Sequence, residues 1–180
     1  MSRLLALLLL VAACLVPACG TDRDDTARCG PLTVEQIDPD EGHLIGGAAA
    51  PTFLTNPPTS GPHTPGAGVV GRQREPVPPL VQVSTLETGA VIIQYGTAVD
   101  PAPLEPLVGD GVILAPGNRI DARAVVATGW LRKMTCVSTD VAALRSFIST
   151  VRGRYGGHGT TTTIASSSPP TTMSPTTTEG

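Results

Sequence analysis

The sequence predicts an α+β fold, in which a small, mostly antiparallel sheet is covered by a C-terminal helix. Residues 90–95 form a β-branched run of strand length, and residues 112–115 and 123–128 are two further strand candidates. Residues 139–152 carry apolar side chains at helical spacing. A helix that buries such a stripe against one face of a sheet gives a layered α+β domain.

The strand candidates are short apolar segments separated by turn residues. Upstream of residues 90–95, the shorter segment 81–83 is interpreted as a preceding strand. A Pro-Gly-Asn sequence at residues 116–118 ends the candidate at 112–115. Because the connection to residues 123–128 is short, these two strands are predicted to form a hairpin.

The helix predicted over residues 139–152 has identifiable ends. Ser138 or Thr139 can cap its first turn, and Gly153 can end it because glycine adopts positive φ easily. Residues 104–108, between a proline and a glycine, predict one or two further helical turns. The apolar face of the long helix consists of Val141, Leu144, Phe147 or Ile148, and Val151.

Four regions follow one another along the 180 residues. Residues 1–18 are interpreted as a lipoprotein signal peptide, residues 19–41 as an acidic tether, and residues 42–155 as a single α+β domain. Residues 156–180 are rich in Thr, Ser and Pro, so we expect a disordered tail, either plain and hydrophilic or bearing O-linked sugars. Within the domain, the Pro- and Gly-rich residues 42–79 predict an ordered, winding loop. Its expected apolar anchors are Leu44, Phe53, Leu54, Val69 and Val70.

The N-terminus is typical of an export signal. Arg3 precedes the apolar run 4–16, which is too short to cross a bilayer. The run leads into Val16-Pro17-Ala18-Cys19, which resembles the lipobox of bacterial lipoproteins and implies a diacylated Cys19. Cys14 also fits the lipobox pattern, and a plain secretory signal without lipid is a third interpretation. We expect the protein on the extracytoplasmic face of the cell membrane, anchored by lipid on Cys19.

The cysteine count agrees with this assignment. If Cys19 is acylated and Cys14 leaves with the signal, Cys29 and Cys136 remain as an even pair. Exported proteins fold in oxidising surroundings, where such pairs become disulfides. We therefore predict a Cys29–Cys136 bridge, the alternative being two free thiols.

Charge is spread unevenly along the chain. Residues 21–41 carry seven acids against two arginines, whereas residues 119–154 carry seven basic residues against two aspartates. The basic residues are dispersed and have no interleaved aromatics, so a solvated surface is the favoured interpretation. Export and a net charge of −3 argue against nucleic-acid binding, and leave the membrane and an unidentified cell-envelope protein as partners.

Two motifs resemble a known family. The segment Pro-Pro-Thr-Ser-Gly-Pro-His at residues 57–63 and the segment Leu-Glu-Thr-Gly-Ala-Val at residues 86–91 are similar to those of the bacterial domain of unknown function 3105. The resemblance covers roughly residues 43–153 and implies an exported or membrane-tethered module of uncharacterised activity. Where the family has an aromatic residue after the first motif, this chain has Thr64.

The departures from the family pattern affect a candidate metal site. Members of the family carry histidines around Leu-Glu, and converging imidazoles suit zinc or copper. This chain has Ser84 and Thr88 at those two positions. The remaining weak candidates for metal ligands are His63, Glu87 and His43. Because hydroxyls are poor ligands for these ions, we expect no bound metal and no cofactor.

Catalytic interpretations are weaker still. Ser60 and His63 resemble a nucleophile and a base, but they are close neighbours in a Pro-stiffened loop, and the sequence has no Gly-x-Ser-x-Gly elbow. It also has no Cys-x-x-Cys pair and no phosphate-binding glycine loop. The sequence therefore favours a non-enzymatic interaction or structural module, with a metal-binding or metal-handling lipoprotein as the alternative and an enzyme third.

Overall fold

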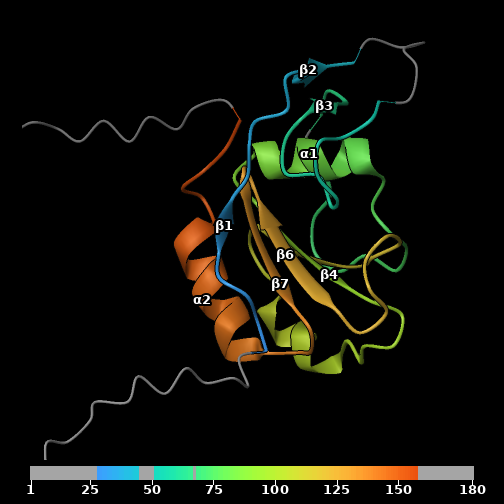
Figure 1. Ribbon diagram of the computed structural model, residues 1–180, viewed down its shortest axis with the longest axis vertical. Helices are drawn as coiled ribbons and strands as arrows, with labels where there is room; N and C mark the ends of the chain where they lie inside the picture. The colour runs from blue at the N-terminus through green and yellow to red at the C-terminus, as the bar shows by residue number, and fades with distance from the viewer. Residues whose placement is uncertain (1–27, 45–50, 67, 158–180) are drawn as a thin grey trace, which may run out of the picture.

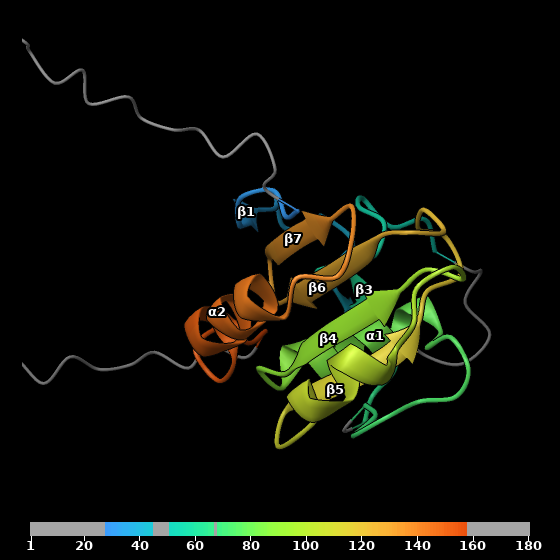
Figure 2. The same ribbon diagram turned by 90° about the horizontal axis from the view of Figure 1, so that it is seen from below.

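The computed structural model describes residues 28–44, 51–66 and 68–157, and its centre is a five-stranded sheet (Figure 1). The strand order is β1-β7-β6-β4-β5, which Figure 2 shows from one edge to the other. Within this sheet only β4 and β5 pair in parallel, so the predicted mostly antiparallel sheet and α+β class are confirmed. The strands are β1 (Thr33–Val34), β4 (Val91–Tyr95), β5 (Val112–Pro116), β6 (Val125–Gly129) and β7 (Arg132–Cys136).

Helices lie against both faces of this sheet. The predicted C-terminal helix is α2 (Val141–Val151), and it shares one core cluster with the 3-10 helix η1 (Ala102–Leu107). A second cluster joins the opposite face to α1 (Pro79–Glu87). Successive residues of β4 serve the two clusters in turn, since Ile93 packs with α2 and Ile92 with α1. Burial on both faces explains why this strand begins with three successive apolar residues, Val91, Ile92 and Ile93.

The predicted strand at residues 81–83 was wrong, because those residues belong to α1. The valines favour a strand, but the flanking residues favour a helix more strongly. Pro79 occupies the first helical turn, where its missing N–H has no partner to lose, and Gly89 follows the helix with φ +83°. Pro before and Gly after a segment of this length are the sequence signal for α1.

The predicted hairpin between residues 112–115 and 123–128 was also wrong. The first strand, β5, pairs with β4 in parallel, and β4 separates it from β6. The hairpin partner of β6 is β7, which the sequence analysis did not predict. The turn between β6 and β7 holds Leu131 at φ +54°.

The ends of α2 correct one prediction and bear out another. Asp140 caps the helix instead of Ser138 or Thr139, and its Oδ1 accepts a hydrogen bond from the backbone N–H of Ala143 at 3.0 Å. Gly153 follows the C-cap at φ +68°, a conformation that glycine adopts without strain.

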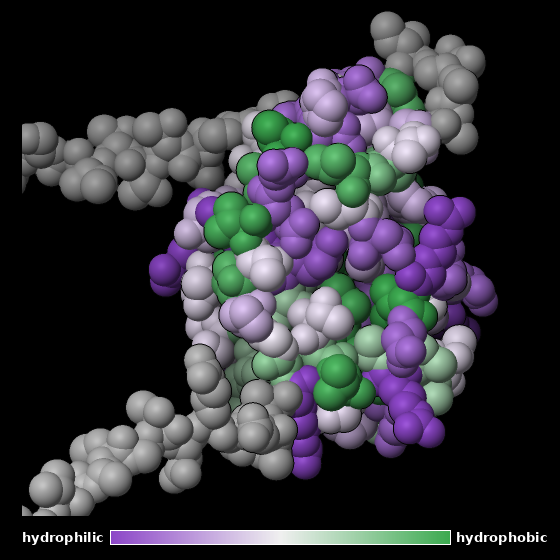
Figure 3. All heavy atoms as spheres, in the orientation of Figure 1, coloured by the Kyte–Doolittle hydropathy of each residue, from purple (hydrophilic) through white to green (hydrophobic). Residues whose placement is uncertain are grey.

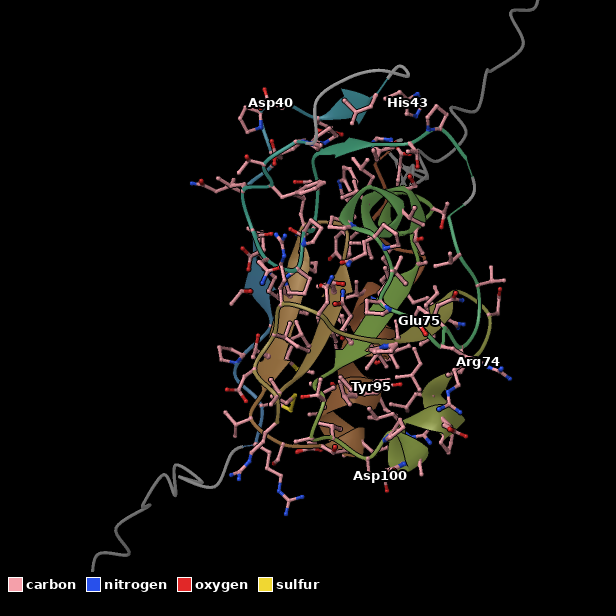
Figure 4. The ribbon with its side chains drawn as sticks, turned by 90° about the vertical axis from the view of Figure 1, so that its right-hand side faces the viewer. Asp40, His43, Arg74, Glu75, Tyr95 and Asp100 are labelled. Atoms are coloured by element: carbon pink, nitrogen blue, oxygen red, sulfur yellow. A yellow bond between two sulfur atoms is a disulfide. The ribbon has the colours of Figure 1, made fainter. Side chains whose placement is uncertain are left out.

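The N-terminal part of the described chain is fastened to the sheet edge. Cys29 and Cys136 form the predicted disulfide, visible as the yellow bond in Figure 4. β1 then pairs with β7 in antiparallel register. The predicted signal peptide, Cys19 and the tail beyond residue 157 lie outside the described residues. Within the described ranges, none of the helices has the length and apolar character that crossing a membrane requires.

The Pro- and Gly-rich loop carries a small second sheet at one end of the molecule. There β2 (Gly42–His43) and β3 (Pro62–His63) pair in parallel, above α1 in Figure 1. Two of the predicted anchors, Phe53 and Val69, pack against the α1 cluster. Leu54 and Val70 are exposed instead, and the partly buried Leu44 donates its backbone N–H to the carbonyl of His63.

Candidate metal site

The pairing of β2 with β3 brings two histidines together. His43 lies opposite His63 in the register, and their ring centroids are 4.7 Å apart in an edge-to-face arrangement. His43 lies at the end of the molecule that carries α1 (Figure 4). His43 is exposed and His63 is buried, so one imidazole faces solvent and the other faces the protein.

His63 is held in one orientation by its Nδ1 atom. Nδ1 lies 3.0 Å from the carbonyl oxygen of Gly61. A carbonyl can only accept a hydrogen bond, so Nδ1 carries the hydrogen. Nε2 therefore points the other way, where Glu87 Oε2 is 2.9 Å distant. That pair is close but not aligned as a hydrogen bond, and among the described residues Nε2 has no hydrogen-bond partner.

Glu87 is the last residue of α1, and the C-terminal segment of the domain packs over it. The backbone N–H of Gly157 donates to the carbonyl of Glu87 at 3.1 Å. A Cβ on Gly157 would lie 2.7 Å from Glu87 Cγ, which is closer than real side chains approach. Glycine is therefore required at this close approach, and the Glu87 side chain is left only 10% exposed.

The three weak candidates from the sequence form one group, which we call the His–Glu cluster. The ligand atoms of His43, His63 and Glu87 all lie within 4.8 Å of one another. The three residues line a pocket of about 260 Å³, together with Glu41 and Gly157. The sequence could not show this convergence, because the residues come from three different elements.

The contact between the imidazole of His63 and the carboxyl group of Glu87 requires a proton or a metal ion between the two facing atoms. With Nδ1 protonated, a neutral His63 directs the Nε2 lone pair toward the carboxylate oxygen 2.9 Å away. Two facing lone pairs repel each other, and burial strengthens the repulsion. Either a proton on Nε2 or a metal ion between the two atoms removes it.

The cluster needs only small movements to surround a metal ion. In a tetrahedral site with bonds of about 2.0–2.1 Å, donor atoms lie roughly 3.3–3.4 Å apart. The His63–Glu87 pair would open by a few tenths of an ångström from 2.9 Å. The widest separation, up to 4.8 Å, would close by about 1.4 Å. Rotation of the exposed His43 side chain supplies a movement of this size.

A buried carboxylate that the sequence analysis missed supports the loop that carries His63. Asp38 is 3% exposed, and its two oxygens accept the backbone N–H groups of Leu54 and Asp40, each at 3.0 Å. The backbone N–H of Asp38 donates to Ser60 Oγ at 2.9 Å. Ser60 thus serves the loop structure, and the Ser60–His63 nucleophile and base pair receives no geometric support.

Gly61 allows the loop to pass close to Asp38. Its φ of +124° lies in a region that residues with a Cβ rarely adopt, and a Cβ there would lie 3.0 Å from Asp38 Oδ2. The same residue supplies the carbonyl that orients His63. Gly61 of the proline-rich motif is therefore needed to hold the imidazole of His63 in its orientation.

The hydroxyl groups of Ser84 and Thr88 contact backbone carbonyl oxygens. Ser84 Oγ lies 2.6 Å from the carbonyl oxygen of Thr64 and 3.2 Å from Thr64 Oγ1. Thr88 Oγ1 donates to the carbonyl of Thr85 at 2.8 Å, and Thr88 lines a different pocket from the His–Glu cluster. Ser84 and Thr64 thus contact each other.

Comparison with known proteins agrees with the sequence motifs. A family model described as "Protein of unknown function (DUF3105)" matches residues 49–164. No curated protein and no solved structure matches the chain. The matched range includes His63 and Glu87, while His43 lies before it.

Proposed function

Since the chain belongs to the DUF3105 family, whose description names no activity, we propose a function from the site itself: the domain binds a transition-metal ion through the His–Glu cluster. The observation that carries the proposal is the convergence of three donor atoms within 4.8 Å. We further propose that the protein works on the extracytoplasmic face of the membrane, where lipid on Cys19 anchors it.

The donor set favours zinc or copper. Two imidazole nitrogens and one carboxylate oxygen suit borderline ions, whereas magnesium and calcium prefer oxygen ligands alone. The bond from His63 Nδ1 to the Gly61 carbonyl is the outer contact that metal-ligating histidines usually make. It fixes the tautomer and leaves Nε2 as the donor for the metal.

The site supports exchange of the ion more than permanent structural binding. Three protein ligands leave a fourth tetrahedral position for water or for a group from a partner. The exposure of His43 and the adjoining pocket of about 260 Å³ give that position access to solvent. These features suit a protein that binds and hands on a metal at the cell surface.

Metal affinity of the purified full-length chain tests the proposal. After removal of chelator, the protein is expected to bind one zinc or copper ion. His43→Ala and Glu87→Gln should each weaken binding by more than the roughly 10–100-fold expected for loss of an outer contact. Glu75→Gln is the matched control, because Glu75 is exposed and lies away from His43 in Figure 4.

Two further variants sharpen the metal experiment. His63→Ala removes the buried donor, and circular dichroism must first establish that it folds. His158→Ala is included because residue 158 follows Gly157 directly in the sequence, although it lies outside the described residues. Equal affinity in the wild type, His43→Ala and Glu87→Gln proteins would reject the His–Glu cluster as the site.

The second candidate is the non-enzymatic interaction or structural module that the sequence favours. The observation for it is that a protonated His63 between the Gly61 carbonyl and Glu87 would fasten the loop to α1 without any metal. In that case the chain binds no metal, and both His63→Ala and Glu87→Gln lower the free energy of unfolding. His43→Ala would then leave stability nearly unchanged.

The anchoring part of the proposal has its own test. The short apolar run and the small residue before Cys19 support diacylation, and two acyl chains hold a protein stably on a membrane. Cys19→Ala should abolish labelling by radioactive fatty acid. Persistent label on that variant would assign the lipid to Cys14 instead.

A further inference from the structure

A second pocket lies between η1 and the last turns of α2, away from the His–Glu cluster. Its volume is about 440 Å³, and it shares no lining residue with the cluster. Arg145, Ser149 and Arg152 line it from one side of α2, because spacings of four and three residues keep them on one helix face. Arg154 follows from the next segment of chain. We call this the arginine pocket.

The arginine pocket carries a concentrated positive charge. Three guanidinium groups line it, and no aspartate or glutamate does. None of the three arginines forms an ion pair with another described residue. Arg152 is held in place by a hydrogen bond from its Nη1 to the carbonyl of Asp110. Like charges gathered without counter-charges attract an anion.

Stabilisation of the C-terminal end of α2 accounts for only two of the three arginines. Cations near a helix C-terminus interact favourably with its dipole, which explains Arg152 and Arg154. Arg145 lies two turns earlier, beyond the reach of that effect. Its position on the same face as Arg152 adds a third guanidinium to the pocket, where one anionic ligand can contact all three.

We propose that the arginine pocket binds a phosphate monoester. A monoester dianion accepts charge-assisted hydrogen bonds from several guanidinium groups, whose planar forks match phosphate geometry. A lipid phosphodiester has one negative charge and complements three arginines less well. Leu107 and Ile148 line the same pocket and give the organic part of the ester an apolar surface. This site is independent of the proposed metal function.

Calorimetric titration of the full-length chain tests this assignment. The protein is stripped of metal and then dialysed free of chelator, so that neither competes. Butyl phosphate is expected to bind more tightly than inorganic phosphate, because it also buries apolar surface, and more tightly than dibutyl phosphate. Arg145→Ala with Arg154→Ala should weaken butyl phosphate binding roughly tenfold or more. Both residues are exposed, and Arg152 is left intact because of its structural bond.

The matched control replaces two exposed arginines elsewhere, Arg74→Ala with Arg119→Ala, and should bind as the wild type does. Circular dichroism must show the same fold for all variants. Absence of saturable binding up to roughly 10 mM would overturn the proposal. So would equal affinity in the Arg145/Arg154 variant, an equal loss in the control, or tighter binding of dibutyl phosphate.

Discussion

At the scale of single residues, His63 indicates that the His–Glu cluster is not only a packing contact. Its imidazole is buried, and the bond to Gly61 leaves Nε2 facing the carboxylate of Glu87. Burying a polar ring beside an anion is unfavourable unless a positive charge lies between them. An apolar side chain would fill the same space without that penalty, so the arrangement calls for either a proton or a metal ion at Nε2.

Asp38 should be important for the loop that carries His63. Asp38→Ala removes the acceptor for the backbone N–H groups of Leu54 and Asp40. We expect the free energy of unfolding to fall by about 1.5–3 kcal/mol, as for other hydrogen bonds to charged groups. Urea denaturation measures the change. Asp40→Ala is the control and should shift stability by less than about 0.5 kcal/mol, since Asp40 is exposed.

Lys133 should make stability depend on pH. Burial lowers the pKa of Lys133 from 10.5, and attraction to Glu35 only partly offsets it. Below the lowered pKa the penalty for burying the charge is fully present. Between the lowered pKa and 10.5 the unfolded chain binds more protons than the folded one. The free energy of unfolding should therefore rise as pH increases through that window.

Denaturation at a series of pH values, on wild type and Lys133→Met, isolates this effect. The variant should lose the alkaline rise and be at least as stable as wild type near neutral pH. Lys133 is the only lysine of the chain, so its titration is also directly visible by NMR of the labelled amine. A wild type whose stability relative to Lys133→Met stays constant with pH would contradict the predicted direction.

At the scale of elements, the local sequence predicts a strand or helix correctly where its residues follow one simple pattern. β4 was predicted from a β-branched run of strand length, and α2 from helical spacing of apolar residues. α1 was missed because most of it is buried, so it lacks the polar face that marks a helix. β7 was missed because Arg132 and Lys133 hide the inward alternation of Met134 and Cys136.

Strand pairing and the site depend on contacts between distant segments. A short connection favours a hairpin, yet β5 pairs with β4 across the η1 crossover. All three members of the His–Glu cluster were candidates from the sequence. Their convergence could not be predicted, because it depends on the packing of two short strands and the end of a helix. Asp38 was missed because an Asp-Pro-Asp sequence is typical of an exposed turn.

The contact between β6 and α2 should depend on Gly129. A Cβ at this position would lie 2.2 Å from Val151 Cγ1, so the Val151 side chain or the helix that carries it must shift to admit it. Gly129→Ala should therefore lower the free energy of unfolding by roughly 1–3 kcal/mol, the usual effect of overpacking. Gly109→Ala is the matched control, because nothing lies within 4 Å of its Cβ position. Thermal denaturation of both variants tests the comparison, and equal melting temperatures would refute it.

At the scale of the whole molecule, β2 and β3, which carry two members of the His–Glu cluster, lie on the far side of α1 from the sheet (Figure 1). On the face drawn in Figure 3, hydrophilic and hydrophobic residues are interspersed, and no single large apolar area gathers there. The exposed large apolar side chains are scattered along the chain in the same way. The two proposals therefore rest on pockets lined by charged side chains, and not on an apolar surface.

The Cys29–Cys136 bridge should contribute much of the stability of the whole domain. The two residues are 107 positions apart. In the unfolded chain the bond therefore closes a long loop that contains most of the residues of the domain. On the chain-entropy model, a loop of this length stabilises by about 4–5 kcal/mol. The double variant Cys29→Ala, Cys136→Ala should lose about that much in urea denaturation, and wild type under reducing conditions should behave similarly.

Treatment with a reductant separates the contribution of the covalent bond to stability from the contribution of the packing of its sulfur atoms. Cys136 is completely buried, so replacing it also removes apolar contacts. If the bond is the main contribution, reductant lowers the stability of wild type strongly and leaves the double variant unchanged. Thiol labelling of a denatured but unreduced Cys19→Ala chain provides the chemical check. Reactive thiols at both Cys29 and Cys136 in that sample would show that the protein does not form the bond.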